Sequence, residues 1–124
     1  MSARFWTVLT LIICVVSLLT ACGARNLQQA MDGAKSVDDI TVQLTLKDAY
    51  NRAITSQYAS TQFAKHTIDE QGGNAYIWYG GDENIYSVIK FLRIAQGVTK
   101  VTFFEGGGVW SDRLAGIRQI LLEK

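Results

Sequence analysis

Hydrophobic residues recur along this chain with two different periods, and the two periods alternate. Between Asp39 and Leu46 apolar side chains take every second position, which is typical of a strand with one buried face. From Leu46 onward they recur at three- and four-residue steps, which predicts a long helix up to Gly72. Ser56 or Ser60 is the expected position of a bend or break in this helix.

The second half of the chain repeats the alternation. Residues 75–79 are apolar on both faces, as in an interior strand, and residues 98–104 form a further expected strand. Between them Asp82 is expected to cap a helix that ends at Gly97. A last helix is expected after a cap at Ser111-Asp112. The apolar stripes are Ile85, Val88, Ile89, Leu92 and Ala95 in the first of these helices, and Leu114, Ile117, Ile120 and Leu121 in the second.

Strand and helix thus alternate three times, and this order predicts the fold class. We expect an α/β domain: a small three-stranded βαβαβα layer whose sheet is mostly parallel or mixed, with right-handed crossovers. A split βαβ arrangement with mixed pairing is the alternative. Because three strands are few, an open sheet edge is expected that could pair with a strand of another protein.

The first residues follow neither period. One basic residue, Arg4, precedes the uncharged apolar run 5–19, and small residues follow it. A short basic region, an apolar core and a small-residue cut site are the parts of a secretory signal peptide. The run is short for a membrane-spanning helix, which needs about 20 apolar residues.

Leu19-Thr20-Ala21-Cys22 resembles the lipobox of bacterial lipoproteins. The resemblance implies cleavage between Ala21 and Cys22, a diacylglycerol thioether on Cys22 Sγ, and acylation of the new amino terminus. Two or more acyl chains would hold the protein stably in a membrane. In the enterobacterial lipoproteins that this resembles, Asp after the cysteine retains the protein in the inner membrane. Gly23 therefore implies the outer membrane, facing the periplasm. The alternative is an uncleaved membrane anchor.

Cleavage would divide the chain into three parts: a signal peptide (1–21), a flexible tether (22–36) and a single small α/β domain (37–124). Removing 21 of the 124 residues leaves 103, which suits one domain. Loss of Arg4 leaves 11 basic and 11 acidic residues, so nucleic acid is not an expected partner. Cys14 leaves with the signal peptide and Cys22 carries lipid, so no other cysteine is left for catalysis or metal binding.

Two glycine turns are the best candidates for a ligand site or interface. Both follow predicted strands and precede predicted helices, where ligands bind in open α/β sheets and helix amino termini favour anions. Neither turn carries the Lys and Ser/Thr of a phosphate loop, and tight turns with caps are the competing interpretation. Trp110 beside the second turn resembles an exposed interface anchor. The candidate residues are Gly80, Gly81, Asp82, Gly106, Gly107, Gly108 and Trp110.

The sequence offers little for catalysis. Asp82, Glu83 and Glu105 could meet at the rim of these turns, but Asp82 and Glu83 are more simply a helix cap and its neighbour. His66 is the single histidine and is expected near the surface. We therefore expect no catalytic residue, no metal site, no cofactor and no enzyme activity.

Residues 75–104 resemble the periplasmic domain of the ExbD/TolR family, which runs strand, turn with an acidic residue and a following Tyr, helix, Gly-Val-x-x-Val and strand. The matching positions are Ile77, Asp82, Tyr86, Gly97, Val98 and Val101. The run 5–19 lacks the acidic residue of that family's membrane segment, and a lipobox is foreign to the family. The resemblance implies a non-enzymatic periplasmic module that binds envelope proteins or associates with itself.

These features predict a lipid-anchored accessory or assembly factor of a cell-envelope complex that works by protein contacts. Its expected partners are membrane lipid, through acylated Cys22, and envelope proteins or a second copy of itself. Two alternatives are a periplasmic binding or sensing domain that takes a small polar ligand at the glycine turns, and an ExbD/TolR-like energy-transduction module.

Overall fold

The computed structural model describes residues 26–60, 62–81, 84–107 and 110–123. The expected signal peptide and the Leu19–Cys22 motif lie outside these residues. The described elements are, in chain order, α2 (Leu27–Asp32), β1 (Ser36–Val42), α3 (Leu46–Ile54), β2 (Ala64–Asp69), β3 (Asn74–Gly80), β4 (Ile85–Ala95), β5 (Val98–Glu105) and α4 (Ser111–Leu122).

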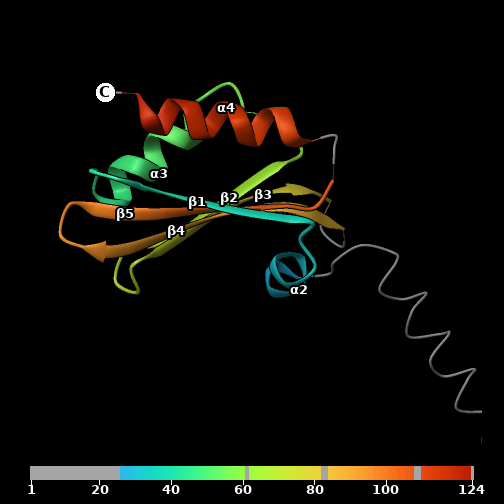
Figure 1. Ribbon diagram of the computed structural model, residues 1–124, viewed down its shortest axis with the longest axis horizontal. Coiled ribbons are helices and arrows are strands. Elements are labelled where there is room, and N and C mark those ends of the chain that lie inside the picture. Colours follow the sequence, from blue (N-terminus) through green and yellow to red (C-terminus); the bar gives the residue numbers. More distant parts are fainter. Residues whose placement is uncertain (1–25, 61, 82–83, 108–109, 124) are drawn as a thin grey trace, which may run out of the picture.

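The strands form one five-stranded sheet in the order β1-β5-β4-β3-β2, and every neighbouring pair is antiparallel. The strands from β2 to β5 follow one another as hairpins, whereas β1 pairs with the outer side of β5. Strand β4 is therefore the centre of the sheet, and β1 and β2 are its edges. Helices α3 and α4 cover one face, and α2 lies against the other (Figure 1).

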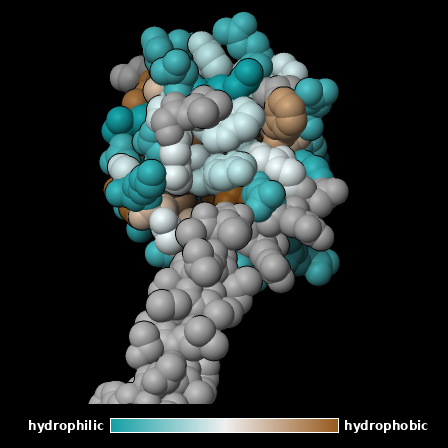
Figure 2. Space-filling model, turned by 90° about the vertical axis from the view of Figure 1, so that its right-hand side faces the viewer, coloured by the Kyte–Doolittle hydropathy of each residue, from teal (hydrophilic) through white to brown (hydrophobic). Residues whose placement is uncertain are grey.

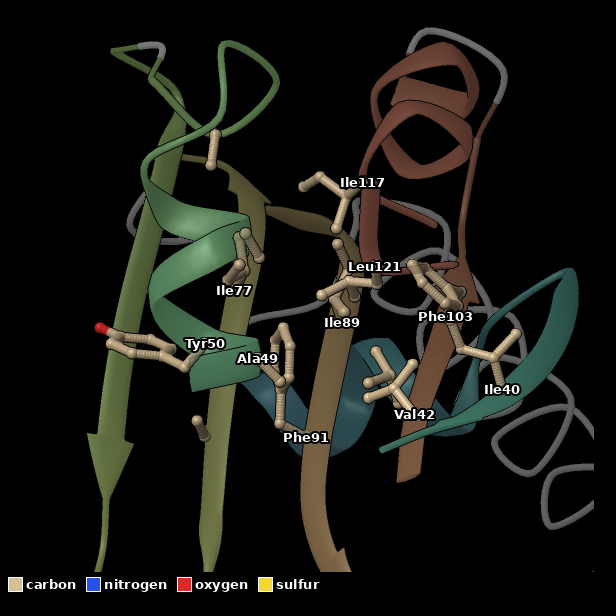
Figure 3. Packing of buried hydrophobic residues seen from close by; sticks show 14 of the residues in the cluster. Ile40, Val42, Ala49, Tyr50, Ile77, Ile89, Phe91, Phe103, Ile117 and Leu121 are labelled. Carbon is tan, nitrogen blue, oxygen red and sulfur yellow. The ribbon is translucent and has the colours of Figure 1, made fainter. Parts of the chain in front are cut away.

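The larger core lies between the sheet and the two longer helices. Ile77, Ile89 and Phe91 point from the sheet towards Ala49 of α3 and Ile117 of α4 (Figure 3). All five side chains are fully buried. Helix α3 begins where the Thr45 side chain accepts a hydrogen bond from the backbone N–H of residue 48, which satisfies an otherwise unpaired donor.

A smaller core lies under α2. The side chain of Asn26 caps this helix by accepting from the backbone N–H of Gln29, at 2.8 Å. Ala30 is buried against Ile85 and Val88 of β4. Five half-buried side chains complete this core: Leu27, Met31, Tyr76, Trp78 and Phe104. The segment expected as a flexible tether, 22–36, is thus helical over Leu27–Asp32 and packed on the sheet; residues 22–25 lie outside the described part.

The expected fold class, a three-stranded βαβαβα layer with a mostly parallel or mixed sheet, is wrong. The sheet has five strands and is antiparallel throughout. The main cause is segment 85–95, which was expected as a helix and forms β4. A central strand buries apolar side chains on both faces, so its pattern loses the period of two and can imitate a helical stripe.

The long helix expected from Leu46 to Gly72 is also wrong beyond Ile54, where α3 ends. Residues 64–69 form the edge strand β2 instead. The first expected strand, 39–46, is shifted: β1 covers Ser36–Val42, and Leu46 begins α3.

Three expected elements are confirmed: the strands at 75–79 and 98–104, and the last helix. The cap of that helix differs from the expectation, because Trp110 is its N-cap residue and Ser111 its first helical residue. Within the described residues, no helix has the length and apolar content needed to cross a membrane.

Adjacent residues of β4 face opposite sides of the sheet, which predicts losses of stability of very different size at Phe91 and Leu92. Phe91 is fully buried, whereas Leu92 is 37% exposed on the other face. Phe91→Ala should lower the free energy of unfolding by about 3–5 kcal/mol. Leu92→Ala should lower it by less than about 1 kcal/mol. Urea unfolding of both variants measures the difference; a larger loss for Leu92→Ala would favour a helix over 85–95 and contradict the strand.

Candidate functional site

The two glycine turns lie at one end of the sheet. Strands β3 and β5 both run antiparallel to the central strand β4, so they run parallel to each other and their last residues lie at the same end of the sheet. Strand β1 begins at this end, because Ser36 lies opposite Glu105. We call the end of the sheet where β1 begins and β3 and β5 finish the entry end. The structure thus places the turns at Gly80 and Gly106 at the same end of the sheet.

The first turn joins two strands rather than a strand and a helix. The backbone N–H of Gly80 donates to the Phe63 carbonyl, and that of Gly81 donates to the Asn84 carbonyl. Gly80 has φ +132°, a conformation that residues with a side chain rarely adopt. Since β4 follows this turn, no helix begins there, and the expected cap at Asp82 and its anion-binding dipole have no helix to act on. Asp82 itself lies outside the described residues.

The second turn is held by hydrogen bonds to its neighbours. The backbone N–H of Gly106 donates to the hydroxyl oxygen of Ser87, which is fully buried. The Ser111 hydroxyl donates to the Glu105 carboxylate, and this bond ties the first residue of α4 to the end of β5. Glu105 therefore has a structural partner. A Cβ added at Gly107 would meet nothing within 4 Å, and Gly108 lies outside the described residues.

Trp110 is half-buried in an aromatic stack, not an isolated exposed anchor. Its ring stacks on Tyr79 with centroids 5.4 Å apart, and Phe63 contacts it with centroids 5.8 Å apart. The Arg113 guanidinium lies 5.9 Å from the ring centre. The buried Tyr79 hydroxyl donates to the Tyr58 carbonyl at 2.8 Å. Burial raises the pKa of Tyr79, and the charge of Arg113 lowers that pKa in part, so the hydroxyl keeps its proton at neutral pH.

Two aromatic side chains at the entry end are exposed; the sequence analysis did not single out Phe63, and it named Tyr86 only on a segment expected to be helical. Phe63 is 48% exposed and packs on Trp110, and Tyr86 is 45% exposed at the start of β4. Tyr86 also lies against both glycines: a Cβ on Gly80 would meet its ring at 3.2 Å, and one on Gly106 would meet its carbonyl oxygen at 1.7 Å. Both residues would have stood out only if 64–69 and 85–95 had been recognised as strands.

The opposite end of the sheet, which we call the far end, holds a shallow groove of about 410 Å³. Its lining comes from the start of α3 and from the β2–β3 and β4–β5 turns, and consists of Thr45, Leu46, Lys47, Glu70, Arg93, Gln96 and Gly97. The Arg93 guanidinium donates to the Glu70 carbonyl and closes one side of the groove. The sequence could not predict this grouping, because it placed Arg93 on a helix.

His66 lies on the edge strand β2, where it is exposed. Its Nδ1 lies 2.5 Å from the hydroxyl of Tyr50, which reaches across from α3 (Figure 3). Burial raises the pKa of Tyr50, which favours the tyrosine as the donor of this hydrogen bond. The pair therefore links α3 to the edge of the sheet. Over the described part of the chain, no three His, Cys, Asp or Glu residues cluster closely enough to hold a metal ion.

The chain matches no known protein-family model, and no curated protein sequence matches it. The resemblance of residues 75–104 to the ExbD/TolR periplasmic domain implied a helix between two strands. Strand β4 occupies that place, so the fold implied by the resemblance is wrong. The functional argument rests on the residues of this chain and their geometry.

The two neighbouring glycines predict a matched pair of variants. Gly106→Ala would place a Cβ 1.7 Å from the Tyr86 carbonyl oxygen, whereas Gly107→Ala would meet nothing within 4 Å. Overpacking of this kind costs about 1–3 kcal/mol or more. We expect Gly106→Ala to lower the midpoint of thermal unfolding by several degrees and Gly107→Ala to leave it nearly unchanged. Equal midpoints would show that the β5–α4 turn does not pack against β4 as described.

Proposed function

We propose that the protein is a bacterial lipoprotein, acylated at Cys22, that serves as a non-enzymatic accessory or assembly factor of a cell-envelope complex. The lipobox Leu19-Thr20-Ala21-Cys22 supports the anchor. Gly23 supports the outer membrane, facing the periplasm, as the location. In this proposal the folded domain recognises envelope proteins, or a second copy of the chain, by surface contacts.

The observation that carries the protein-contact part is the position of the exposed aliphatic side chains. Four large aliphatic side chains are exposed in the described residues. Val37, 57% exposed, lies near the start of β1 at the entry end. The other three are Leu92, Ile94 (51% exposed) and Leu122 (54% exposed). Strand β4 runs away from the entry end and α4 runs the same way, so these residues lie towards the far end (Figure 1). An anchor attached before Asn26 leaves that end free to meet a partner.

The chemistry around these side chains suits a protein interface. Arg93 and Ile94 are neighbours on β4, and the groove beside Arg93 also carries Lys47 and Glu70. Apolar contacts bordered by charged groups that remain accessible to water are the usual composition of non-obligate interfaces. Lys47 and Arg93 would favour an acidic segment of the partner over a basic one.

The two cysteines of the chain give a matched test of the anchor. Cells fed a palmitate analogue should label the wild type and the Cys14→Ser variant equally, because Cys14 is removed with the signal peptide. Cys22→Ser should lose the label and remain as the longer precursor, because it has no thiol to acylate. Unlabelled wild-type protein, or label that depends on Cys14, would overturn the lipoprotein proposal.

The partner contact can be tested by a photo-reactive amino acid placed at single exposed positions in cells. Incorporation at Ile94 should give discrete adducts larger than the monomer, because the far end is the proposed interface. Incorporation at Asp112, exposed at the start of α4 near the entry end, serves as the control and should give fewer. Only monomer at residue 94, or equal adducts at both positions, would contradict contact through the far end.

A further inference from the structure

The distance between the lipidated cysteine and the folded domain is short. Asn26 caps α2 and is thereby part of the described fold. Cys22 precedes it by four residues, and four residues span at most about 14 Å when fully extended. If Cys22 is acylated, as the proposed function holds, α2 cannot move farther than this from the lipid headgroups.

Helix α2 lies near one end of the sheet. It packs on Trp78, Val88 and Phe104, which face one another across three strands. Trp78 is two residues from the end of β3 at Gly80, or about 7 Å at the usual rise of a strand. Val88 is seven residues, or about 24 Å, from the other end of β4 at Ala95. The attachment point is therefore at the entry end.

The side chains of the entry end suit the headgroup layer. Phe63 and Tyr86 are exposed there, and Trp110 is half-buried beside Phe63. Tyrosine and tryptophan prefer the boundary between hydrocarbon and water, because each has an apolar body and a polar group. Viewed onto this end, the described surface is mostly hydrophilic or intermediate with few hydrophobic groups, which suits contact at headgroup depth rather than insertion (Figure 2).

A link of at most about 14 Å between Cys22 and Asn26 would also allow the domain to lie with α2 against the membrane. The chemistry of that face argues against this orientation. The exposed side chains of α2 are Gln28, Gln29 and Asp32, which are polar or acidic. Gln28 donates a hydrogen bond to Asp32, so this helix offers polar groups and no aromatic ring to the headgroup layer. In the described residues, the large aromatic side chains that are exposed, Phe63 and Tyr86, both lie at the entry end. The aromatic entry end is the better match.

We propose that the entry end, through Phe63, Tyr86 and Trp110, rests on the phospholipid headgroups of the membrane that holds Cys22. This contact fixes the orientation of the domain. The far end, with Ile94, Leu122 and the groove beside Arg93, then points away from the bilayer. The short tether and the aromatic contact act together: the tether confines the domain, and the aromatic side chains select which surface faces the lipid.

The test uses spin labels on the lipidated protein, purified from cells and reconstituted in phospholipid vesicles. After cleavage Cys22 is the single cysteine and its thiol is acylated, so Tyr86→Cys, Gln28→Cys and Gln96→Cys each provide one labelling site. These positions report the entry end, the α2 face and the far end. The measurement is the collision rate of each label with lipid-soluble oxygen relative to a water-soluble nickel complex.

We expect the oxygen-to-nickel ratio at residue 86 to exceed the ratios at residues 28 and 96 severalfold. A maximum at residue 28 or 96, or equal ratios at all three positions, would overturn the orientation. An immobilised label at residue 86 without oxygen collisions would mean that a protein surface, not lipid, covers the entry end, and would also overturn it.

Two controls distinguish a failure of the docking from a failure of the lipoprotein proposal, and test the role of the tether length. Intact-mass analysis of each sample reports the acyl chains: acylated protein with no lipid contact at residue 86 refutes only the docking, whereas unacylated protein refutes the lipoprotein proposal and the docking with it. Insertion of about twelve Gly and Ser residues before Asn26 lengthens the tether by roughly 20 Å. The ratio at residue 86 should then fall severalfold, and an unchanged ratio would refute the role of the short tether.

Discussion

The structure depends on one constraint: the central strand β4 must be covered on both faces. Ile89 and Phe91 are buried against α3 and α4, whereas Ile85 and Val88 on the other face are buried under α2. Without α2, Ile85 and Val88 would be exposed to water, at a cost of roughly 1.5–3 kcal/mol for each side chain. The segment from Asn26 to Asp32 is therefore part of the fold, and it begins four residues after Cys22.

The same constraint explains which parts of the fold the sequence could predict. Strand β3 is a compact apolar run between glycine turns, β5 alternates apolar and polar residues between Gly97 and Gly106, and α4 carries a helical stripe, so these three were recognised. Strand β4 was not, because residues such as Val88 and Ile89 are adjacent and both buried, on opposite faces. Its β-branched and aromatic content, including Tyr86 and Phe91, was the available signal for a strand.

The two glycine turns lie at the same end of the sheet, but not in the setting that the sequence analysis expected. The sequence analysis placed them at the carboxyl ends of parallel strands that precede helices. In the structure Gly80 and Gly106 meet because β3 and β5 flank β4 in an antiparallel sheet. The helix amino terminus expected at Asp82 is absent from this geometry. The exposure of Phe63 and the groove beside Arg93 depend on the strand pairing and left no local pattern in the sequence.

The most direct test of the central claim, that α2 is packed on β4, is amide hydrogen exchange in α2. The backbone N–H of Ala30 donates to the Asn26 carbonyl, and that of Gly33 donates to the Gln29 carbonyl. If α2 is packed on β4, these two amides should exchange orders of magnitude more slowly than in an unstructured peptide. Exchange at the rate of an unstructured peptide would show that the segment after Cys22 is a free tether, which would contradict the short link and the orientation inferred from it.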